Sequence, residues 1–148
     1  MMGSTMPLRM RGKADFRALR EKLGVTQPLL AKRLHRDVRT VKAWEDPRFH
    51  YGPPREAWDW LQGLEMDMWR SVARTVADAE ERRREAREAG QADPVVSLPY
   101  FRHQMEYESV GAPLGWFRLA NAASARAGDE LNAKGFSVDY EYPAGAEN

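Results

Sequence analysis

Cationic and hydroxyl side chains recur at helical spacing between residues 36 and 42 of this 148-residue chain. Guanidinium, ammonium and hydroxyl groups donate hydrogen bonds to phosphate oxygens and to base edges, so a helix face that carries several of them has the chemistry of nucleic-acid recognition. The set comprises Arg36, Arg39, Thr40 and Lys42. Arg39 and Lys42 are three positions apart, which places them on the same face of a helix.

The residue types that enzymes use do not form a catalytic pattern in this sequence. Cysteine is absent, and there is neither a glycine-rich phosphate loop nor a serine nucleophile elbow. The histidines His35, His50 and His103 lie far apart along the chain. His103 is close to Glu106 and Glu108, but neighbouring polar residues on a surface are far commoner than an acid–base pair. We therefore expect no enzyme, and neither a cofactor nor a metal site.

Two short helices joined by a tight turn are predicted to position the donors, within residues 26–44. Thr26 is a good N-cap and Pro28 falls in the first helical turn, where a missing N–H costs little. Asp37 can cap the second helix. Apolar residues recur at helical spacing in both helices and should face inward. They are Leu29, Leu30, Ala31, Leu34, Val38, Val41 and Trp44.

This segment resembles the helix-turn-helix of phage-repressor regulators, the Cro/CI-like or XRE class. The resemblance rests on Thr26-Gln27, Leu30-Ala31, Leu34, Val41 and Trp44-Glu45. In that family the residue matching Gln27 packs on a phosphate, and the residues matching Val38, Arg39, Lys42 and Ala43 face base edges. The loop that follows grips the DNA backbone, a role that Arg48, His50 and Tyr51 can fill here.

Two positions depart from the family pattern. His35 stands where the family usually has glycine in a left-handed conformation, and Arg36 replaces an apolar residue and must turn outward. Histidine tolerates positive φ better than most side chains do. The resulting set of predicted DNA-contacting residues is Gln27, Arg36, Val38, Arg39, Thr40, Lys42, Ala43 and Arg48.

Charge is distributed unevenly around a net value of +1. Residues 1–60 carry 13 basic and 7 acidic side chains, whereas residues 61–148 carry 10 and 15. A basic front half that contains the motif is typical of a DNA-binding head on a separate body, although chance clustering gives the same pattern.

No apolar run approaches the length of a membrane span, and the lack of cysteine fits a reducing cytoplasm, so we expect a cytoplasmic protein without a membrane partner.

We expect a mainly α protein with a small β element. Its predicted divisions are a flexible arm over 1–13, a helix-turn-helix DNA-binding domain over 14–62, a connecting helix over 63–90 and a C-terminal α+β dimerisation part over 91–148. The arm carries cations that could enter a minor groove, or it is simply a disordered end. Helices are predicted over 15–23, 55–89 and 116–133, and strands over 95–98 and 136–142; residues 99–108 are ambiguous, with a short helix favoured.

A looser resemblance concerns the order of the predicted elements: a DNA-binding head, a long helix and a further helix over 116–133. This order is similar to that of anti-CRISPR-associated repressors and related two-part bacterial regulators. It rests on Trp116, Arg118, Asn121 and the run from Ala122 to Ala125. It implies a homodimer formed by the C-terminal part. The expected partners are therefore double-stranded DNA and a second copy of the chain.

The expected function is sequence-specific transcriptional regulation, most simply repression of a palindromic operator, and the protein's own operon is one candidate target. One alternative is an antitoxin whose C-terminal half binds a toxin. Another is a head that binds RNA or protein. For the second half, the alternative to a dimer is that its apolar faces pack on each other within one chain.

Overall fold

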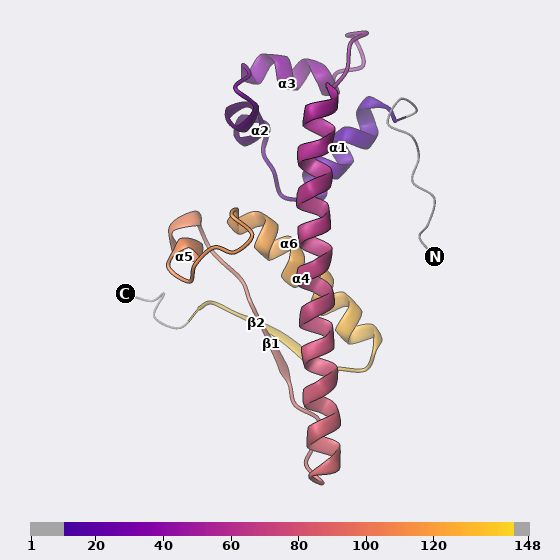
Figure 1. Ribbon diagram of the computed structural model, residues 1–148, viewed down its shortest axis with the longest axis vertical. Helices are drawn as coiled ribbons and strands as arrows, with labels where there is room; N and C mark the ends of the chain where they lie inside the picture. Colours follow the sequence, from indigo (N-terminus) through magenta and orange to yellow (C-terminus); the bar gives the residue numbers. More distant parts are fainter. Residues whose placement is uncertain (1–10, 144–148) are drawn as a thin grey trace. The chain divides into compact units, whose positions relative to one another are not determined.

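The computed structural model describes residues 11–143, and within this range six helices and two strands occur (Figure 1). The expectation of a mainly helical protein with a small β element is thus confirmed. The chain divides into two compact units between Glu65 and Met66. The long helix α4, Arg55–Glu88, contributes its first part to unit 1 and the remainder to unit 2. Residues 1–10 of the expected arm lie outside the described residues.

Unit 1 is built from three short helices and the first part of α4. The short helices are α1 (Lys13–Lys22), α2 (Gln27–Leu34) and α3 (Val38–Glu45). An aromatic group forms the centre of its core: the ring of Phe16 meets Trp44 at 6.3 Å and Trp58 at 5.0 Å, edge to face in both cases. Trp44 is only 4% exposed, which confirms that it is a core residue.

Local chemistry sets the ends of α2 and α3. The Thr26 hydroxyl accepts a hydrogen bond from the Leu29 N–H at 3.2 Å, and the Asp37 carboxylate accepts one from the Arg39 N–H at 2.8 Å. His35 ends α2 in the left-handed conformation, with φ 55° and ψ 47°. The Arg36 N–H then bonds to the Ala31 carbonyl at 2.8 Å, so the turn closes in the manner of a Schellman motif.

Lys13 is part of the folded unit, which corrects its assignment to a flexible arm. Helix α1 begins at Lys13, two residues before the predicted start. The Lys13 ammonium donates to the carbonyl oxygens of Ala43 at 2.9 Å and Trp44 at 3.1 Å, and also to that of Tyr51. Two of these carbonyls lie at the C-terminal end of α3, where the helix dipole favours a cation. The contact spans about 30 residues of sequence, and no local pattern signals it.

Unit 2 packs the remainder of α4 against α6, Phe117–Ala133. Apolar side chains of α4 recur at helical spacing and are buried; they are Met68, Val72, Val76 and Ala79. Facing them, α6 contributes a stripe of small residues with Leu119 and Leu131. Where α6 ends, Arg83 of α4 donates to the Lys134 carbonyl at 3.0 Å and stacks on the Phe136 ring at 3.8 Å.

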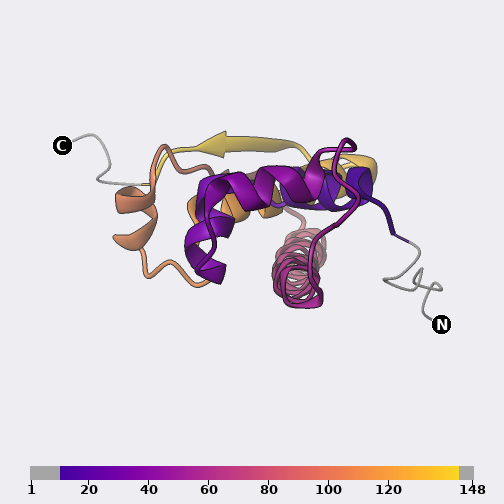
Figure 2. The same ribbon diagram turned by 90° about the horizontal axis from the view of Figure 1, so that it is seen from above.

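A two-stranded parallel sheet covers the other side of α6. Strand β1, Val96–Pro99, pairs with β2, Val138–Glu141, in the register that sets Val96 opposite Val138. Parallel strands need a crossover connection, and here α5 (Gln104–Glu108) and α6 provide it. Figure 2 shows α6 between the sheet and α4.

Strand β2 is shorter than the predicted strand over 136–142, and none of its four residues is fully buried. Phe136 closes α6 instead, because its N–H bonds to the Leu131 carbonyl. Tyr140 and Tyr142 are about half exposed. The Tyr140 hydroxyl occupies the space beside Gly128, where an added Cβ would lie only 2.1 Å from it. Glycine in the middle of α6 therefore makes room for a tyrosine on the sheet.

Candidate nucleic-acid interface

Helix α3 exposes the two cations that the sequence singled out. The side chain of Arg39 is 88% exposed, and Lys42 is exposed as well. Val38 and Thr40 are half-buried. The buried face, with Val41 and Trp44, is held by α1 and α2, so the helix is a rigid support for the outward side chains.

Ala43 does not lie on the outward face. It is 6% exposed, and its expected contact with base edges is therefore wrong for this structure. Ala43 lies beside the buried Trp44 in the last turn of α3, where the Lys13 ammonium of α1 also reaches the Ala43 carbonyl. The resemblance carried Ala43 by position alone, without regard to the packing that surrounds it.

The Asp37 carboxylate organises the start of α3. Its hydrogen bond from the Arg39 backbone N–H lowers the pKa of Asp37, and the Arg39 guanidinium adds to this effect through its charge and a contact of 3.5 Å. The Arg39 side chain is thus drawn toward the N-terminal end of α3. That end also carries the partial positive charge of the helix dipole.

Arg36 turns outward, as the sequence requires of a charged residue at that position. Its guanidinium forms an ion pair with Glu56 of α4 and donates weakly to the Leu34 carbonyl at 3.4 Å. Both charged side chains are roughly half exposed. The pair links the turn after α2 to the start of α4.

Arg48 lies in the loop after α3 and is held by Asp46. The guanidinium contacts the carboxylate at 2.6 to 3.1 Å, and the Arg48 backbone N–H bonds to the same group at 2.9 Å. These hydrogen bonds, the side-chain ones first, lower the pKa of Asp46 to about 2. The rings of Phe49 and Tyr51 are exposed and meet edge to face at 5.6 Å, so neither packs into the core of the unit.

A buried ion pair behind α3 was not predicted. Arg20 and Glu45 form two hydrogen bonds of 2.6 and 2.8 Å, and their side chains are 9% and 4% exposed. Arg20 also donates to the Val25 carbonyl at 2.9 Å. The sequence signal for the burial of Arg20 is its position in α1, four residues after the buried Phe16.

Gln27 joins the same network. Its amide nitrogen donates to Glu45 at 3.1 Å, and the side chain is half-buried at the start of α2. The amide thus ties the first turn of α2 to the last turn of α3. A phosphate contact by Gln27, as the resemblance implies, would use the part of the amide that Glu45 leaves available.

The histidines occupy structural positions. His35 forms the left-handed turn, His50 lies against Tyr51 on the exposed loop, and His103 caps α5 by accepting a hydrogen bond from the Glu106 N–H at 3.1 Å. Glu106 is paired with Arg102 at 2.6 Å. Across residues 11–143, no three potential metal ligands come together, and no helix has the length and apolar character needed to cross a membrane.

No protein-family model matches the chain, and no curated protein is significantly similar to it.

Proposed function

We propose that unit 1 is a helix-turn-helix head that binds double-stranded DNA, and that the protein is a sequence-specific transcriptional regulator. Helix α3 enters the major groove in this proposal, and α2 crosses the backbone beside it. Repression by occupying a promoter is the simplest mode of action, since DNA binding alone is sufficient for it.

One observation carries the proposal: a short helix, capped at its start and buried on one side, presents two exposed cations three residues apart. Arg39 and Lys42 are these cations. Arginine and lysine reach the O6 and N7 acceptors of guanine in the major groove. The Lys13 contact and the Arg20–Glu45 pair hold the other end of α3, so the helix is already ordered before DNA binds.

The surrounding ion pairs are compatible with phosphate contacts. Arg36, Arg39 and Arg48 each have a neighbouring carboxylate in the free chain. Exposed pairs of this kind contribute little to stability, so a DNA phosphate can replace the carboxylate at little cost. We propose that Arg39 reads a base, whereas Arg36 and Arg48 contact the backbone on either side of the groove.

We also propose that the protein acts on DNA as a homodimer. One recognition helix covers only a few base pairs, which gives too low a specificity ratio against a genome. The apolar face of α4 does not need a second chain to cover it, because Met68, Val72 and Val76 are buried within one chain. The proposal of a dimer is therefore supported only by the small number of base pairs that a single head can contact.

Selection of bound sequences from a random DNA pool tests the function directly. The expected result is enrichment of one sequence with twofold symmetry. Equal affinity for unrelated duplexes would contradict sequence-specific regulation and favour the RNA-binding or protein-binding alternative. Recovery of a toxin as a stoichiometric partner of residues 66–148, without enriched DNA, would favour the antitoxin.

A further inference from the structure

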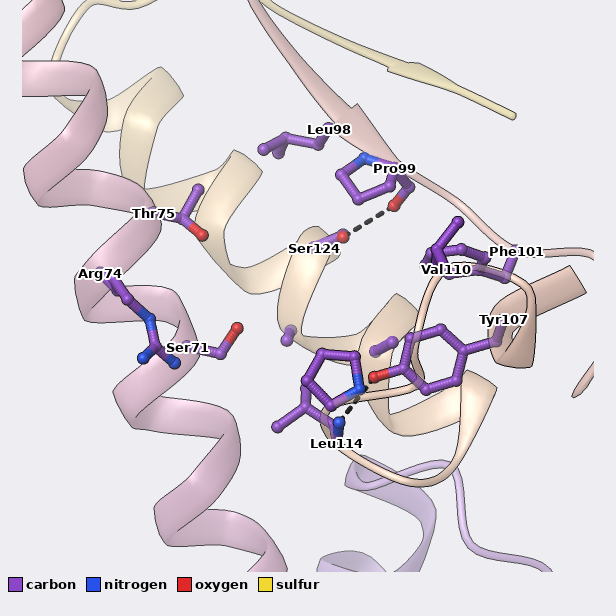
Figure 3. Close-up of a pocket in the computed structure, with 13 residues that line it drawn as sticks. Ser71, Arg74, Thr75, Leu98, Pro99, Phe101, Tyr107, Val110, Leu114 and Ser124 are labelled. Atoms are coloured by element: carbon purple, nitrogen blue, oxygen red, sulfur yellow. Dashed lines mark hydrogen bonds between the residues drawn. The ribbon is translucent and has the colours of Figure 1, made fainter. Parts of the chain in front are cut away.

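Unit 2 contains a cavity of about 330 Å³ that the proposed DNA-binding role does not use (Figure 3). Its walls come from α4, α6, the end of β1 and the loop between α5 and α6. All of the lining residues belong to the same unit.

The deep part of the cavity is apolar and its rim is open. Leu98, Phe101 and Tyr107 are almost completely buried, and Ala123 of α6 is also buried. At the rim, Val110 is 51% exposed although it is a large apolar residue. An apolar body placed in the cavity would therefore lose contact with water on most sides and would also cover Val110.

The α4 wall carries a guanidinium without a carboxylate partner. Among the described residues of α4 in unit 2, Arg70, Arg82, Arg84 and Arg87 each form an ion pair with an acidic side chain. No such pair forms for Arg74 within residues 11–143. Asp78, one turn further along, is engaged by Arg82 at 2.9 Å. Arg74 is thus an exposed cation beside an apolar cavity, and among residues 11–143 no carboxylate forms an ion pair with it.

Hydroxyl groups lie beside this guanidinium. Ser71 and Thr75 line the same wall, one turn apart, and neither hydroxyl has a hydrogen-bond partner in the part of the chain that the structure describes (Figure 3). On the opposite side, the Tyr107 oxygen accepts from the Leu114 N–H at 2.7 Å and keeps its own proton to donate. Ser124 differs, because it already donates to the Pro99 carbonyl at 2.8 Å.

We propose that this cavity binds a small monocarboxylate with an apolar body, aromatic or short-chain aliphatic, whose carboxylate pairs with Arg74. A guanidinium forms bidentate hydrogen bonds with a carboxylate, and the hydroxyls of Ser71 and Thr75 can complete its shell. The volume is roughly twice the ~150 Å³ that accommodates benzene, so it leaves room for a ring or a chain of several carbons. This inference goes beyond the proposed DNA binding and does not depend on it.

Calorimetric titration of the full chain, without DNA, tests the site with three probes of the same chain length. Octanoate carries the carboxylate, 1-octanol replaces it with a hydroxyl, and octylammonium reverses the charge. The expected order of affinity is octanoate, then octanol, then octylammonium, with one octanoate bound per chain. Inorganic phosphate tests an anion that has no apolar body, and it should bind much more weakly than octanoate.

Two variants of α4 test whether the Arg74 guanidinium binds the carboxylate of octanoate. Arg74→Gln should weaken octanoate by about tenfold to a hundredfold, as expected for losing hydrogen bonds to a charged group, and should leave octanol unchanged. Arg70→Gln is the matched control, since it removes an exposed arginine one turn away that does not line the cavity. A third variant, Ser71→Leu, should reduce the binding of both octanoate and octanol by filling the space.

Several results would overturn the proposal. These are equal affinity for octanoate and octanol, equal losses in Arg74→Gln and Arg70→Gln, phosphate binding as tightly as octanoate, or no saturable binding at millimolar octanoate. Circular dichroism of each variant confirms that it folds, and because no DNA is present, none of these results bears on the DNA-binding proposal.

Discussion

At the scale of single residues, His35 combines a side chain that has a Cβ with a left-handed backbone conformation, φ 55°. A residue with a Cβ pays about 1–2 kcal/mol in the left-handed region, whereas glycine does not. We expect His35→Gly to stabilise the protein by about 0.5–1 kcal/mol in chemical denaturation. Lys32→Gly is the matched control, because it places glycine inside α2 at an ordinary helical position and should destabilise by about 1 kcal/mol. A loss of stability in His35→Gly would mean that the imidazole has a role of its own.

Arg39 is the residue on which the base-reading proposal depends. Arg39→Ala should cost about 1–3 kcal/mol on the selected operator and relax the preference at one base pair. The measurement compares Kd for the operator and for random duplex at the same salt concentration. Arg82→Ala removes another exposed arginine that pairs with an aspartate and should leave both Kd values unchanged. If Arg39→Ala weakens operator and random DNA equally, Arg39 contacts only phosphate.

Asp46 should contribute a pH dependence to stability. Its pKa in the folded chain is about 2, below the ordinary value of 3.8, so the folded state favours the ionised form. The stabilisation of the folded state by the ionised Asp46 carboxylate is complete above about pH 4 and is lost as the pH falls through 2. Melting temperatures of the parent and of Asp46→Asn should therefore differ at pH 6 and converge toward pH 2. A difference that stays constant across this range would show that the Arg48 contact does not hold the carboxylate ionised.

At the scale of elements, the Arg20–Glu45 pair joins α1 to the end of α3. Arg20→Met should destabilise by about 3–5 kcal/mol, because it leaves the Glu45 carboxylate buried without its cation. The double variant Arg20→Met with Glu45→Met should recover most of this loss, since neither charge then remains buried. Urea denaturation of both single variants and of the double variant gives the coupling. Additive losses would contradict a direct pairing of the two side chains.

The same pair explains how two short helices are held in fixed positions relative to each other. Helices α2 and α3 have only eight residues each, which is too short for stability in isolation. Caps set where each helix begins, but packing on Phe16 and the bonds to Glu45 hold α3 against its neighbours. The orientation of the exposed side of α3 is therefore a property of the whole unit.

At the scale of the molecule, the proposed homodimer makes a prediction about both mass and DNA. Sedimentation at micromolar concentration should give twice the chain mass, and the complex should hold two chains on half-sites about 34–36 Å apart. Scrambling one half-site should weaken binding strongly, whereas a change in the spacer sequence at constant length should have a smaller effect. A monomer that binds one asymmetric site with nanomolar affinity would contradict the dimer and the palindrome together.

The sequence by itself determined the features that depend on neighbouring residues. The caps at Thr26 and Asp37 and the burial of Trp44 follow from side-chain chemistry or helical spacing within a few positions, whereas the left-handed turn at His35 was implied by the resemblance to the repressor helix-turn-helix. The presence of the later helix and of a short strand near residue 96 was predictable for the same reason. Where each helix starts and which residues it buries are largely local questions.

The tertiary structure decided which polar groups have partners and which do not. Lys13 reaches the end of α3 and Arg20 meets Glu45 because separate helices pack together, and the same packing buries Ala43. Arg74 borders a cavity because α4, α6 and the end of β1 meet there, which no spacing along α4 reveals. Such contacts join positions far apart in the chain, and their energies depend on burial and distance, so they exist only once the core has formed.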